Sequence, residues 1–388
     1  MHSPAARFLF AVAGVAAGLA VAATTVQAQG RAREFLQEDG LVTVTLGGAP
    51  VRLEVLTVRS ADRTGRLPIA LVTHGKPASD DDLATVHASN FRSLARDLAR
   101  RGWFAVAVVR RGFGLSEGEH AYAGTCRPGA DLGAMFRREG EDLAAVLAEV
   151  GRRPYADPSR VIALGGSAGG AAVLALASQP PPGLRAVVNV SGGLRLNACP
   201  FEDRLVAALA GLRPKVPALW VYARNDRTFP ADLVTRMHAA AVAAGSDARM
   251  TMLDPVGEDG HHIFMSTDGR VRWYAALDAF LIDMGLPTIG PADVEVLMAA
   301  GLEPAQRTAA LRYLSVPGEK ALARPAGGGR LNWSMSGGDV AQARRSALEQ
   351  CEKSGARCEI VAENNRLAPA SPPAAAGTPT RESAQGAR

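Results

Sequence analysis

The sequence predicts an α/β protein with a doubly wound, mostly parallel sheet, followed by a small C-terminal α+β domain. Apolar segments of strand length alternate along the chain with segments of helical periodicity, which is the pattern of a parallel sheet covered by helices. Residues 161–172 show this most clearly, because an apolar run breaks at two glycines, presents one serine and restarts as an Ala-rich helix. The 388 residues, 47% of them hydrophobic, suffice for a large core and exceed one average domain.

Each element of the sheet is predicted from a local pattern. Two β-rich segments flank Gly47-Gly48, at 41–46 and 51–58, and predict a hairpin. Short apolar runs predict further strands at 68–73, 103–109, from 161 onward, 184–190, 218–222 and 249–253. Helical spacing predicts helices at 91–101, 132–150, 171–178, about 201–209, 230–244 and 270–284. In such sheets, reacting groups are expected beyond the carboxyl ends of the strands.

The serine at the break in residues 161–172 lies in a Gly-x-Ser-x-Gly pattern, with Gly165 and Gly169 on either side of Ser167. Glycines are needed there because side chains would collide across so tight a turn. The pentapeptide alone is a weak signal, since a chain with 41 glycines should contain roughly 0.2 such matches by chance. The strand before it and the helix after it supply the context of a nucleophile elbow, so we expect Ser167 to be exposed on a strand-to-helix turn.

Other motifs follow in a fixed order around this turn. They are His74-Gly75, Arg111-Gly112-x-Gly114-x-Ser116-x-Gly118, Asn225-Asp226 and Asp259-Gly260-His261-x-x-Phe264. With them the chain resembles the α/β-hydrolase superfamily, and within it the dienelactone-hydrolase-like and prolyl-oligopeptidase-like branch, over about residues 40–285. The resemblance implies the α/β-hydrolase fold and a nucleophile, acid and base in the order Ser, Asp, His. The dienelactone hydrolases themselves use a cysteine where this chain has Ser167, so their substrate does not carry over.

The resemblance also implies catalytic roles. Ser167 is expected as the nucleophile, and His261 as the base that accepts its proton and later protonates the leaving group. Asp226 is expected to orient the imidazole and to stabilise the imidazolium. Neighbouring side chains of an extended loop point in opposite directions, so His262 is expected at the rim of the site, with Phe264 in a packing position.

The same resemblance implies the residues around the oxyanion. We expect the backbone N–H groups of Ala168 and Lys76, or of Gly75 in place of Lys76, to form the oxyanion hole. His74 is expected to shape this loop rather than act as a second base. Arg111 is expected to support its own loop by hydrogen bonds rather than to touch substrate.

Other acidic residues are less suitable for these roles. Asp254 and Asp259 compete with Asp226 but occur too late in the chain. Asp80-Asp81-Asp82 could suggest a metal site, but three consecutive side chains point in different directions, so a solvated loop is expected. No Cys-x-x-Cys occurs and no histidine lies beside a cysteine, so a zinc site is not expected either. We therefore expect no metal and no cofactor.

Residues 1–28 have the pattern of a secretory signal peptide. Arg7 precedes an uninterrupted apolar run over 8–23, and a small-x-small cleavage site ends at Ala28, after which we expect cleavage. An uncleaved membrane anchor is the alternative, because no other charge interrupts the segment. The mature protein is therefore expected in the periplasm or outside the cell, with no stable membrane insertion after cleavage.

Export changes the interpretation of the four cysteines, because an even number in an oxidising compartment indicates disulfides. Three pairings are possible, of which Cys351 with Cys358 is the most economical and leaves Cys126 with Cys199. The last two lie in loops that leave the catalytic edge of the sheet from the strands at 103–109 and 184–190. In the usual strand order those strands are about 14 Å apart, at about 4.8 Å per strand, and a bridge there would brace the mouth of the site.

The chain is accordingly divided into a signal peptide (1–28), a catalytic domain (29–290), a linker with a helix over 291–302 (291–312), a small cysteine-containing domain (313–367) and a disordered tail (368–388). The small domain loosely resembles accessory domains of secreted bacterial proteins, and it is left as a candidate binding unit for an unidentified partner. Fewer than thirty residues separate the strands at 184–190 and 218–222, so no large lid is expected over the site.

Composition limits the class of partner. The formal net charge is +5 and the basic residues are scattered, so nucleic acid is not an expected partner. Our leading interpretation is an exported serine hydrolase that cleaves small ester substrates. The alternatives are a serine peptidase or amidase with the same residues, and a non-catalytic envelope binding protein that retains a hydrolase domain.

Overall fold

The structure, a computed structural model, describes residues 33–368. The predicted signal peptide and nearly all of the predicted tail therefore lie outside the described residues. Among the residues from 33 to 368, no helix combines the length and the apolar character needed to cross a membrane.

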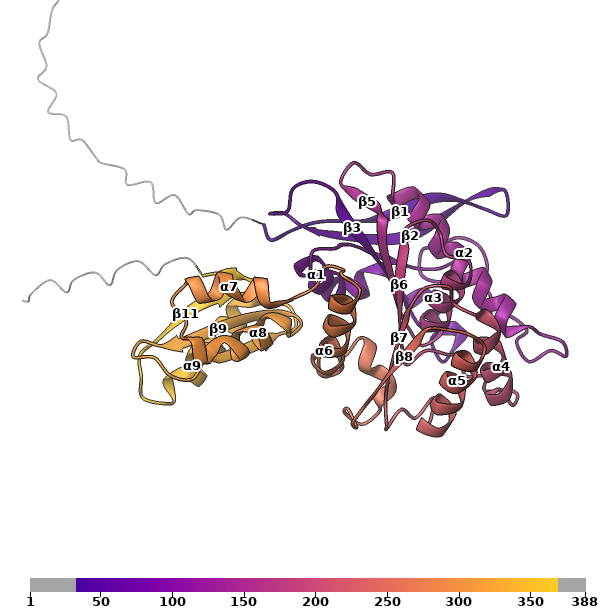
Figure 1. Cartoon of the computed structure of the whole chain (residues 1–388). Helices are drawn as coiled ribbons and strands as arrows, with labels where there is room; N and C mark the ends of the chain where they lie inside the picture. The colour runs from indigo at the N-terminus through magenta and orange to yellow at the C-terminus, as the bar shows by residue number, and fades with distance from the viewer. Residues whose placement is uncertain (1–32, 369–388) are drawn as a thin grey trace, which may run out of the picture. The chain divides into compact units, whose positions relative to one another are not determined.

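A sheet of eight strands organises most of the described chain, in the order β1-β2-β4-β3-β5-β6-β7-β8 (Figure 1). Its strands are β1 (Phe35–Leu46), β2 (Ala49–Ser60), β3 (Leu67–Thr73), β4 (Phe104–Val108), β5 (Ala156–Gly166), β6 (Leu184–Val190), β7 (Ala218–Ala223) and β8 (Ala248–Leu253). Strand β2 pairs antiparallel with β1 and β4, and every pair from β4 to β8 is parallel. The predicted doubly wound, mostly parallel sheet is confirmed.

Helices cover both faces of this sheet (Figure 1). One face carries α2 (Leu132–Val150), α3 (Ala168–Ser178), α4 (Glu202–Leu212) and α5 (Ala231–Ala243), and the other carries α1 (Arg92–Arg100) and α6 (Thr267–Asp283). Short 3₁₀ turns complete the loops: η1 (Asp80–Thr85), η2 (Ala88–Phe91) and η3 (Gly260–Phe264). Helix α2 and strand β6 have the predicted bounds, and the other predicted elements differ by a few residues at their ends, most of all β1, which begins at Phe35 rather than at residue 41.

Helix α3, which follows Ser167, is buried along its whole length. Its residues are mostly Ala and Gly, so neighbouring backbones approach it closely. A Cβ atom placed on Gly140 of α2 would lie 2.9 Å from the backbone nitrogen of Leu176. Small side chains on both helices therefore allow α3 to lie deep in the domain, which holds the preceding turn in a fixed position.

The C-terminal residues form a second sheet, antiparallel, in the order β10-β9-β11-β12. Its elements are α7 (Pro291–Ala299), η4 (Pro304–Gln306), α8 (Arg307–Ser315), β9 (Glu319–Pro325), β10 (Asn332–Ser336), α9 (Val340–Glu352), β11 (Cys358–Glu363) and β12 (Arg366–Leu367). The fold class predicted for this part, a small α+β domain, agrees with these elements. The sequence also predicts a helix at 340–351 and a strand at 358–361, which agree with α9 and β11 to within two residues. It predicts neither α8 nor strands β9, β10 and β12.

The sequence places a helix over 291–302, in a linker over 291–312, as an element docked on the catalytic domain. In the structure Val294 of α7 packs in a core with residues of α8, β9 and β11. The reason is the alternation of β9, in which Leu322 faces the core formed with α7 and α8, whereas Ala321 and Ala323 face α9. A sheet with two apolar faces needs cover on both, and α7 and α8 supply one of the two layers.

Candidate active site

Ser167 lies on a tight turn between β5 and α3, as the motif predicts. Its φ of 53° and ψ of −126° are sparsely populated for a residue with a side chain, so the turn is strained. Glycines make it possible: a Cβ on Gly165 would lie 2.1 Å from the carbonyl oxygen of Gly169, and a Cβ on Gly169 would lie 2.4 Å from that of His74. The Ser167 carbonyl accepts hydrogen bonds from the N–H groups of Gly170 and Gly193.

Three side chains from three different loops form a hydrogen-bonded series. The Ser167 Oγ lies 3.1 Å from His261 Nε2, and His261 Nδ1 lies 3.1 and 3.2 Å from the two carboxylate oxygens of Asp226. The carboxylate is inaccessible to solvent and its Oδ1 also accepts the N–H groups of Thr228 (2.8 Å) and Phe229 (2.9 Å). A carboxylate held in this way favours a proton on Nδ1, which leaves the Nε2 lone pair facing the serine.

The backbone around His261 is held by the competing acid, Asp259. Its Oδ1 accepts the backbone N–H groups of His261 (2.9 Å) and Arg227 (3.0 Å), so it orients the loop and not the imidazole. Partial burial acts to raise the pKa of Asp259, but the hydrogen bonds from these two N–H groups outweigh it, and the pKa is lowered. The other competitor, Asp254, is 88% exposed in its side chain and takes no part.

The two neighbouring histidines differ in exposure, although they lie in the 3₁₀ turn η3 and not in the extended loop from which this was expected. The side chain of His261 is 13% exposed, whereas that of His262 is 76% exposed, at the rim of the cavity described below. Gly260 allows the loop to approach β7, because a Cβ there would lie 2.6 Å from the Cβ of Ala223. Phe264 packs under the elbow, where a Cβ on Gly166 would lie 2.4 Å from its ring.

The loop after β3 lies against the nucleophile. A Cβ on Gly75 would lie 2.9 Å from the Cβ of Ser167, and Gly75 and Lys76 line the cavity beside it. Ala168 is the first residue of α3, where backbone N–H groups have no partner within the helix. The structure thus places the expected oxyanion residues, Ala168 and Lys76 or Gly75, next to Ser167.

His74 shapes this loop from below. Its Nε2 accepts the N–H of Arg110 (2.9 Å) and its Nδ1 donates to the Gly75 carbonyl (2.7 Å), so neither nitrogen is available as a base. Burial, together with the Arg110 guanidinium, holds the pKa of His74 well below its usual range. Sequence reasoning missed Arg110, which is buried and donates to Thr73 Oγ1 (2.7 Å) and to the His74 carbonyl (2.6 Å). The Arg-Arg-Gly sequence after β4 was the available signal.

Arg111 supports the next loop. Its backbone N–H donates to Asp142 Oδ2 (2.8 Å) and its Nε pairs with Asp142 Oδ1 at 2.6 Å. Burial raises the pKa of Asp142 in spite of these contacts. The expected buttressing contacts of Arg111 are therefore present, and it is absent from the residues that line the cavity.

A cavity of about 630 Å³ opens at Ser167, a size suited to a small organic ligand. Aromatic and aliphatic side chains make up much of its wall. The lining residues are Gly75, Lys76, Pro77, Ala78, Asp80, Phe91, Tyr122, Thr125, Cys126, Gly166, Ser167, Leu194, Arg195, Leu196, Asn197, Ala198, Thr228, His261, His262, Phe264, Met265 and Ser266.

The acidic run at 80–82 contributes one carboxylate to this cavity. Asp80 pairs with Lys76 at 2.6 Å, and the hydrogen bond from Lys76 lowers the pKa of that carboxyl. Within residues 33–368, no group of His, Cys, Asp or Glu side chains has the arrangement of a metal site.

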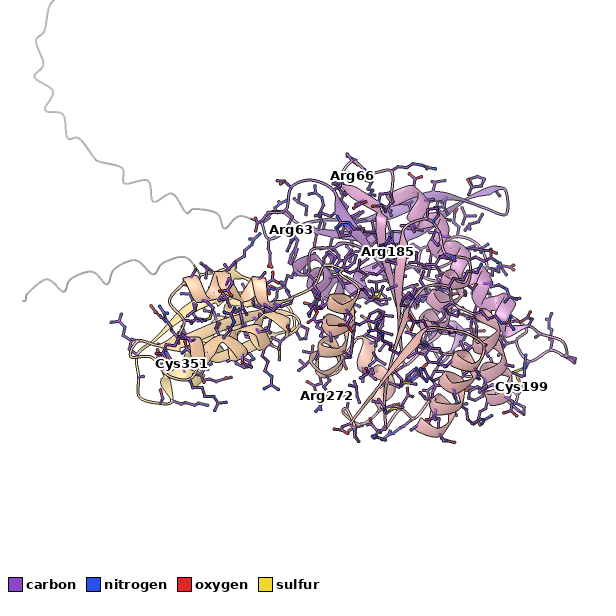
Figure 2. All side chains as sticks on the ribbon, viewed as in Figure 1. Arg63, Arg66, Arg185, Cys199, Arg272 and Cys351 are labelled. Carbon is purple, nitrogen blue, oxygen red and sulfur yellow. A yellow bond between two sulfur atoms is a disulfide. The ribbon has the colours of Figure 1, made fainter. Side chains whose placement is uncertain are left out.

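The structure contains both predicted disulfides. Cys126 and Cys199 have their Cα atoms 5.7 Å apart, and Cys351 and Cys358 have theirs 6.1 Å apart. Figure 2 labels one cysteine of each pair: Cys199 lies close to α4, and Cys351 lies in the C-terminal domain. Strands β4 and β6 are separated by β3 and β5, so the loops that carry Cys126 and Cys199 both lean over the central strands.

Comparison with known proteins agrees with this fold. Residues 84–252 match the family model described as "Serine aminopeptidase, S33". No curated protein sequence matches the chain. The similar solved structures include an esterase from Pyrococcus furiosus, with 16% identity, a TM-score of 0.45, and coverage of 63% of this chain and 90% of that one.

Two further similar structures carry descriptions of other hydrolases. A Klebsiella pneumoniae protein provisionally described as a dienelactone hydrolase has 20% identity and a TM-score of 0.42, over 64% of this chain and 99% of the other. Dipeptidyl peptidase 4 from Porphyromonas gingivalis has 20% identity and a TM-score of 0.45, over 64% of this chain and 35% of the other. Likenesses of this size say nothing about substrate. The chain has the α/β-hydrolase fold, and its residues 84–252 match a serine hydrolase family whose model is described as a serine aminopeptidase.

Proposed function

We propose that the protein is an exported serine hydrolase that cleaves carboxylic esters through an acyl-enzyme. One observation carries this proposal: Ser167 Oγ, His261 and Asp226 form a continuous hydrogen-bonded series that opens on a cavity. An isolated serine hydroxyl is a weak nucleophile, and a neutral imidazole within hydrogen-bonding distance removes that limitation.

The reaction follows from this geometry. As Ser167 Oγ attacks the ester carbonyl, its proton passes to His261 Nε2, and the imidazolium is stabilised by the Asp226 carboxylate. The imidazolium then gives this proton to the leaving alkoxide, and the alcohol departs. Water repeats the sequence on the acyl-enzyme, with His261 as base, which releases the carboxylic acid and restores Ser167.

Backbone N–H groups stabilise the oxyanion that forms in both steps. We assign this role to Ala168 and to Lys76 or Gly75, because these residues lie around the nucleophile and the N-terminus of α3 faces it. Removal of one such donor costs about 3 kcal/mol in other serine hydrolases. The rigid burial of α3 keeps these donors in position before substrate binds.

The charges of the cavity favour esters over peptides with a free amino terminus. An aminopeptidase needs an acidic group to bind the substrate ammonium. Among the lining residues, the one carboxylate is that of Asp80, and it is already paired with Lys76. The description of the matched family keeps the peptidase as the second candidate.

Two further features support export. Both disulfides require an oxidising compartment to persist. The signal-peptide pattern of residues 1–28 would direct the chain to such a compartment.

The test is a comparison of wild type with Ser167→Ala. Wild type should hydrolyse p-nitrophenyl esters faster than aminoacyl p-nitroanilides, and a fluorophosphonate probe should label Ser167. Ser167→Ala should lose about ten-thousandfold or more in kcat and all labelling, because the members of such a series act as a unit. Faster anilide hydrolysis would favour the peptidase, and an unlabelled, inactive wild type would favour the non-catalytic binding protein.

A further inference from the structure

Two loops that take no part in the chemistry form one wall of the cavity. Residues 122, 125 and 126 come from the loop between β4 and α2, and residues 194–198 come from the loop between β6 and α4. The Cys126–Cys199 disulfide joins the two loops next to the cavity. We call this pair of segments, 122–126 and 194–199, the cross-linked wall. Ser167, Asp226 and His261 all lie outside it.

The first of the two loops has few other attachments. Residues 123–130 contain no helix or strand. Arg204 of α4 donates to the carbonyls of Thr125 (2.8 Å) and Ala130 (3.0 Å), and it also donates to the Cys199 sulfur (3.5 Å). Within residues 33–368, the other hydrogen bonds of 123–130 stay inside the loop. Both attachments of this loop therefore run to the segment 199–204.

The side chains of the cross-linked wall are suited to apolar groups. Tyr122, Leu194 and Leu196 are buried and line the cavity, and Phe91 lines it too. An apolar acyl chain gains affinity from each methylene group only while such side chains stay in contact with it. A loop free to move outward would forfeit that contact, since dispersion attraction falls steeply over a gap of less than 1 Å.

We infer that the Cys126–Cys199 disulfide determines acyl-chain specificity, by holding the cross-linked wall against apolar acyl groups of medium length. This rests on the proposed function as an esterase. The disulfide acts as a positioning element, because it touches the wall and not the reacting atoms. A medium-length chain has more methylene groups to place against the wall than an acetyl group has, and the two substrates therefore depend on the disulfide to different degrees.

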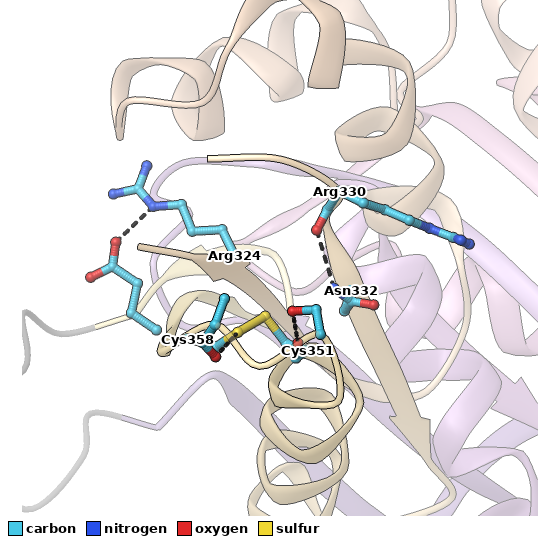
Figure 3. Close-up of a disulfide and its surroundings, with 8 residues drawn as sticks. Arg324, Arg330, Asn332, Cys351 and Cys358 are labelled. Carbon is cyan, nitrogen blue, oxygen red and sulfur yellow. Dashed lines mark hydrogen bonds and ion pairs between the residues drawn. A yellow bond between two sulfur atoms is a disulfide. The ribbon is translucent and has the colours of Figure 1, made fainter. Parts of the chain in front are cut away.

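The test uses a double variant, Cys126→Ser with Cys199→Ser, and a matched control, Cys351→Ser with Cys358→Ser. The control removes the other disulfide, which links the end of α9 to β11 in the C-terminal domain (Figure 3). For both variants and wild type, kcat and KM are measured for p-nitrophenyl acetate, butyrate, octanoate and dodecanoate. The concentration of reactive Ser167 is determined by fluorophosphonate titration. Each kcat is then calculated per active site, so that unfolded protein in a preparation does not lower it.

In wild type and in the control, octanoate should be preferred over acetate in kcat/KM. In the Cys126/Cys199 variant this preference should fall by about tenfold or more, mainly through KM, because discrimination by a hydrophobic pocket is of that order per methylene group lost. An unchanged preference in that variant, or an equal fall in the control, would overturn the inference. A wild type that hydrolyses no ester overturns the proposed function instead.

A second comparison covers the case in which the variant does not fold. The control variant retains Cys126 and Cys199 as its only cysteines. Its preference is measured before and after reduction with a phosphine, and the free thiols are verified by mass spectrometry. Reduction should lower the preference for octanoate, and oxidation back to the disulfide should restore it. A preference that is independent of the thiol state would contradict the inference.

Discussion

Replacement of Asp226 by Asn is the sharpest test of the site, because the structure dictates how the new amide must orient. Oδ1 of Asp226 accepts two backbone N–H groups, those of Thr228 and Phe229. In Asp226→Asn the amide oxygen must keep this place, since an NH₂ group there would face two other donors. The NH₂ group therefore takes the place of Oδ2, which lies 3.2 Å from His261 Nδ1.

That orientation inverts the imidazole tautomer. An NH₂ donor beside Nδ1 favours a lone pair on Nδ1 and a proton on Nε2, which faces Ser167 Oγ at 3.1 Å. The retained amide oxygen also lies 3.1 Å from Nδ1, but it is a neutral acceptor that already accepts two backbone N–H groups, so it competes weakly for the imidazole proton. In the inverted tautomer His261 cannot accept the serine proton. We expect kcat to fall about ten-thousandfold with the geometry intact, which corresponds to about 5.4 kcal/mol of transition-state stabilisation.

The assay is p-nitrophenyl ester hydrolysis, with kcat and KM measured separately. KM should change little, because Asp226 is inaccessible to solvent and does not reach the cavity. Asp259→Asn is the matched control. Its Oδ1 also accepts two backbone N–H groups, so the amide oxygen can replace it without affecting the imidazole. We expect that control to lose less than about tenfold in kcat.

Two results would refute this reasoning. The first is an Asp226→Asn variant that retains kcat within tenfold of wild type, which would mean that another group orients His261. The second is an Asp259→Asn variant that loses as much kcat as Asp226→Asn does. That result would identify Asp259, in the same loop as His261, as the acid that orients the imidazole. Circular dichroism and thermal unfolding of both variants exclude unfolding as the cause of any loss.

Three more predictions follow from the same contacts. His261→Ala should match Ser167→Ala in lost kcat, whereas His262→Ala should cost less than about tenfold because its side chain is 76% exposed; the reverse order would identify His262 as the base. Gly165→Ala should abolish both activity and fluorophosphonate labelling, since its Cβ would lie 2.1 Å from a backbone oxygen; a labelled, active variant would show that the turn can relax. Because the pKa of His74 is depressed on folding, the unfolded chain takes up a proton below about pH 6.5 and the folded chain does not. The free energy of unfolding, measured by urea titration, should therefore be retained above that pH and should fall below it by up to about 1.4 kcal/mol per pH unit, and a flat profile between pH 7.5 and 5.5 would contradict a buried neutral His74.

The predicted elements of the α/β domain agree with the structure because their signals are local. Strands β3, β4, β6 and β7 are almost entirely buried and appear as continuous apolar runs, and the helices between them carry regular apolar spacing. The C-terminal domain was harder to predict. Strand β9 spans Lys320-Ala321-Leu322-Ala323, and its lysine is fully buried, donating to the carbonyls of Leu314 and Val316. Lysine is rarely buried, so it argues against a buried strand when the sequence is considered alone. Its Nζ finds hydrogen-bond acceptors here only because the tertiary fold brings two carbonyls from outside β9 next to it.

The sequence by itself predicted the three residues that the structure brings together at the site. Gly165-Gly166-Ser167-Ala168-Gly169 can form few other turns between a buried strand and a helix, and the Asp and His that follow are each marked by a local motif. It also identified the cysteine pairs, because four cysteines leave few choices.

Only the tertiary structure decided which groups surround that chemistry. It showed that Asp259 holds the loop of His261, that Arg110 braces His74, that α7 belongs to the second core, and that one disulfide joins the two loops of the cavity wall. Each of these contacts joins residues that belong to different loops or elements. Their positions depend on strand order and on loops with no periodicity, and neither is encoded in the pattern of any one segment.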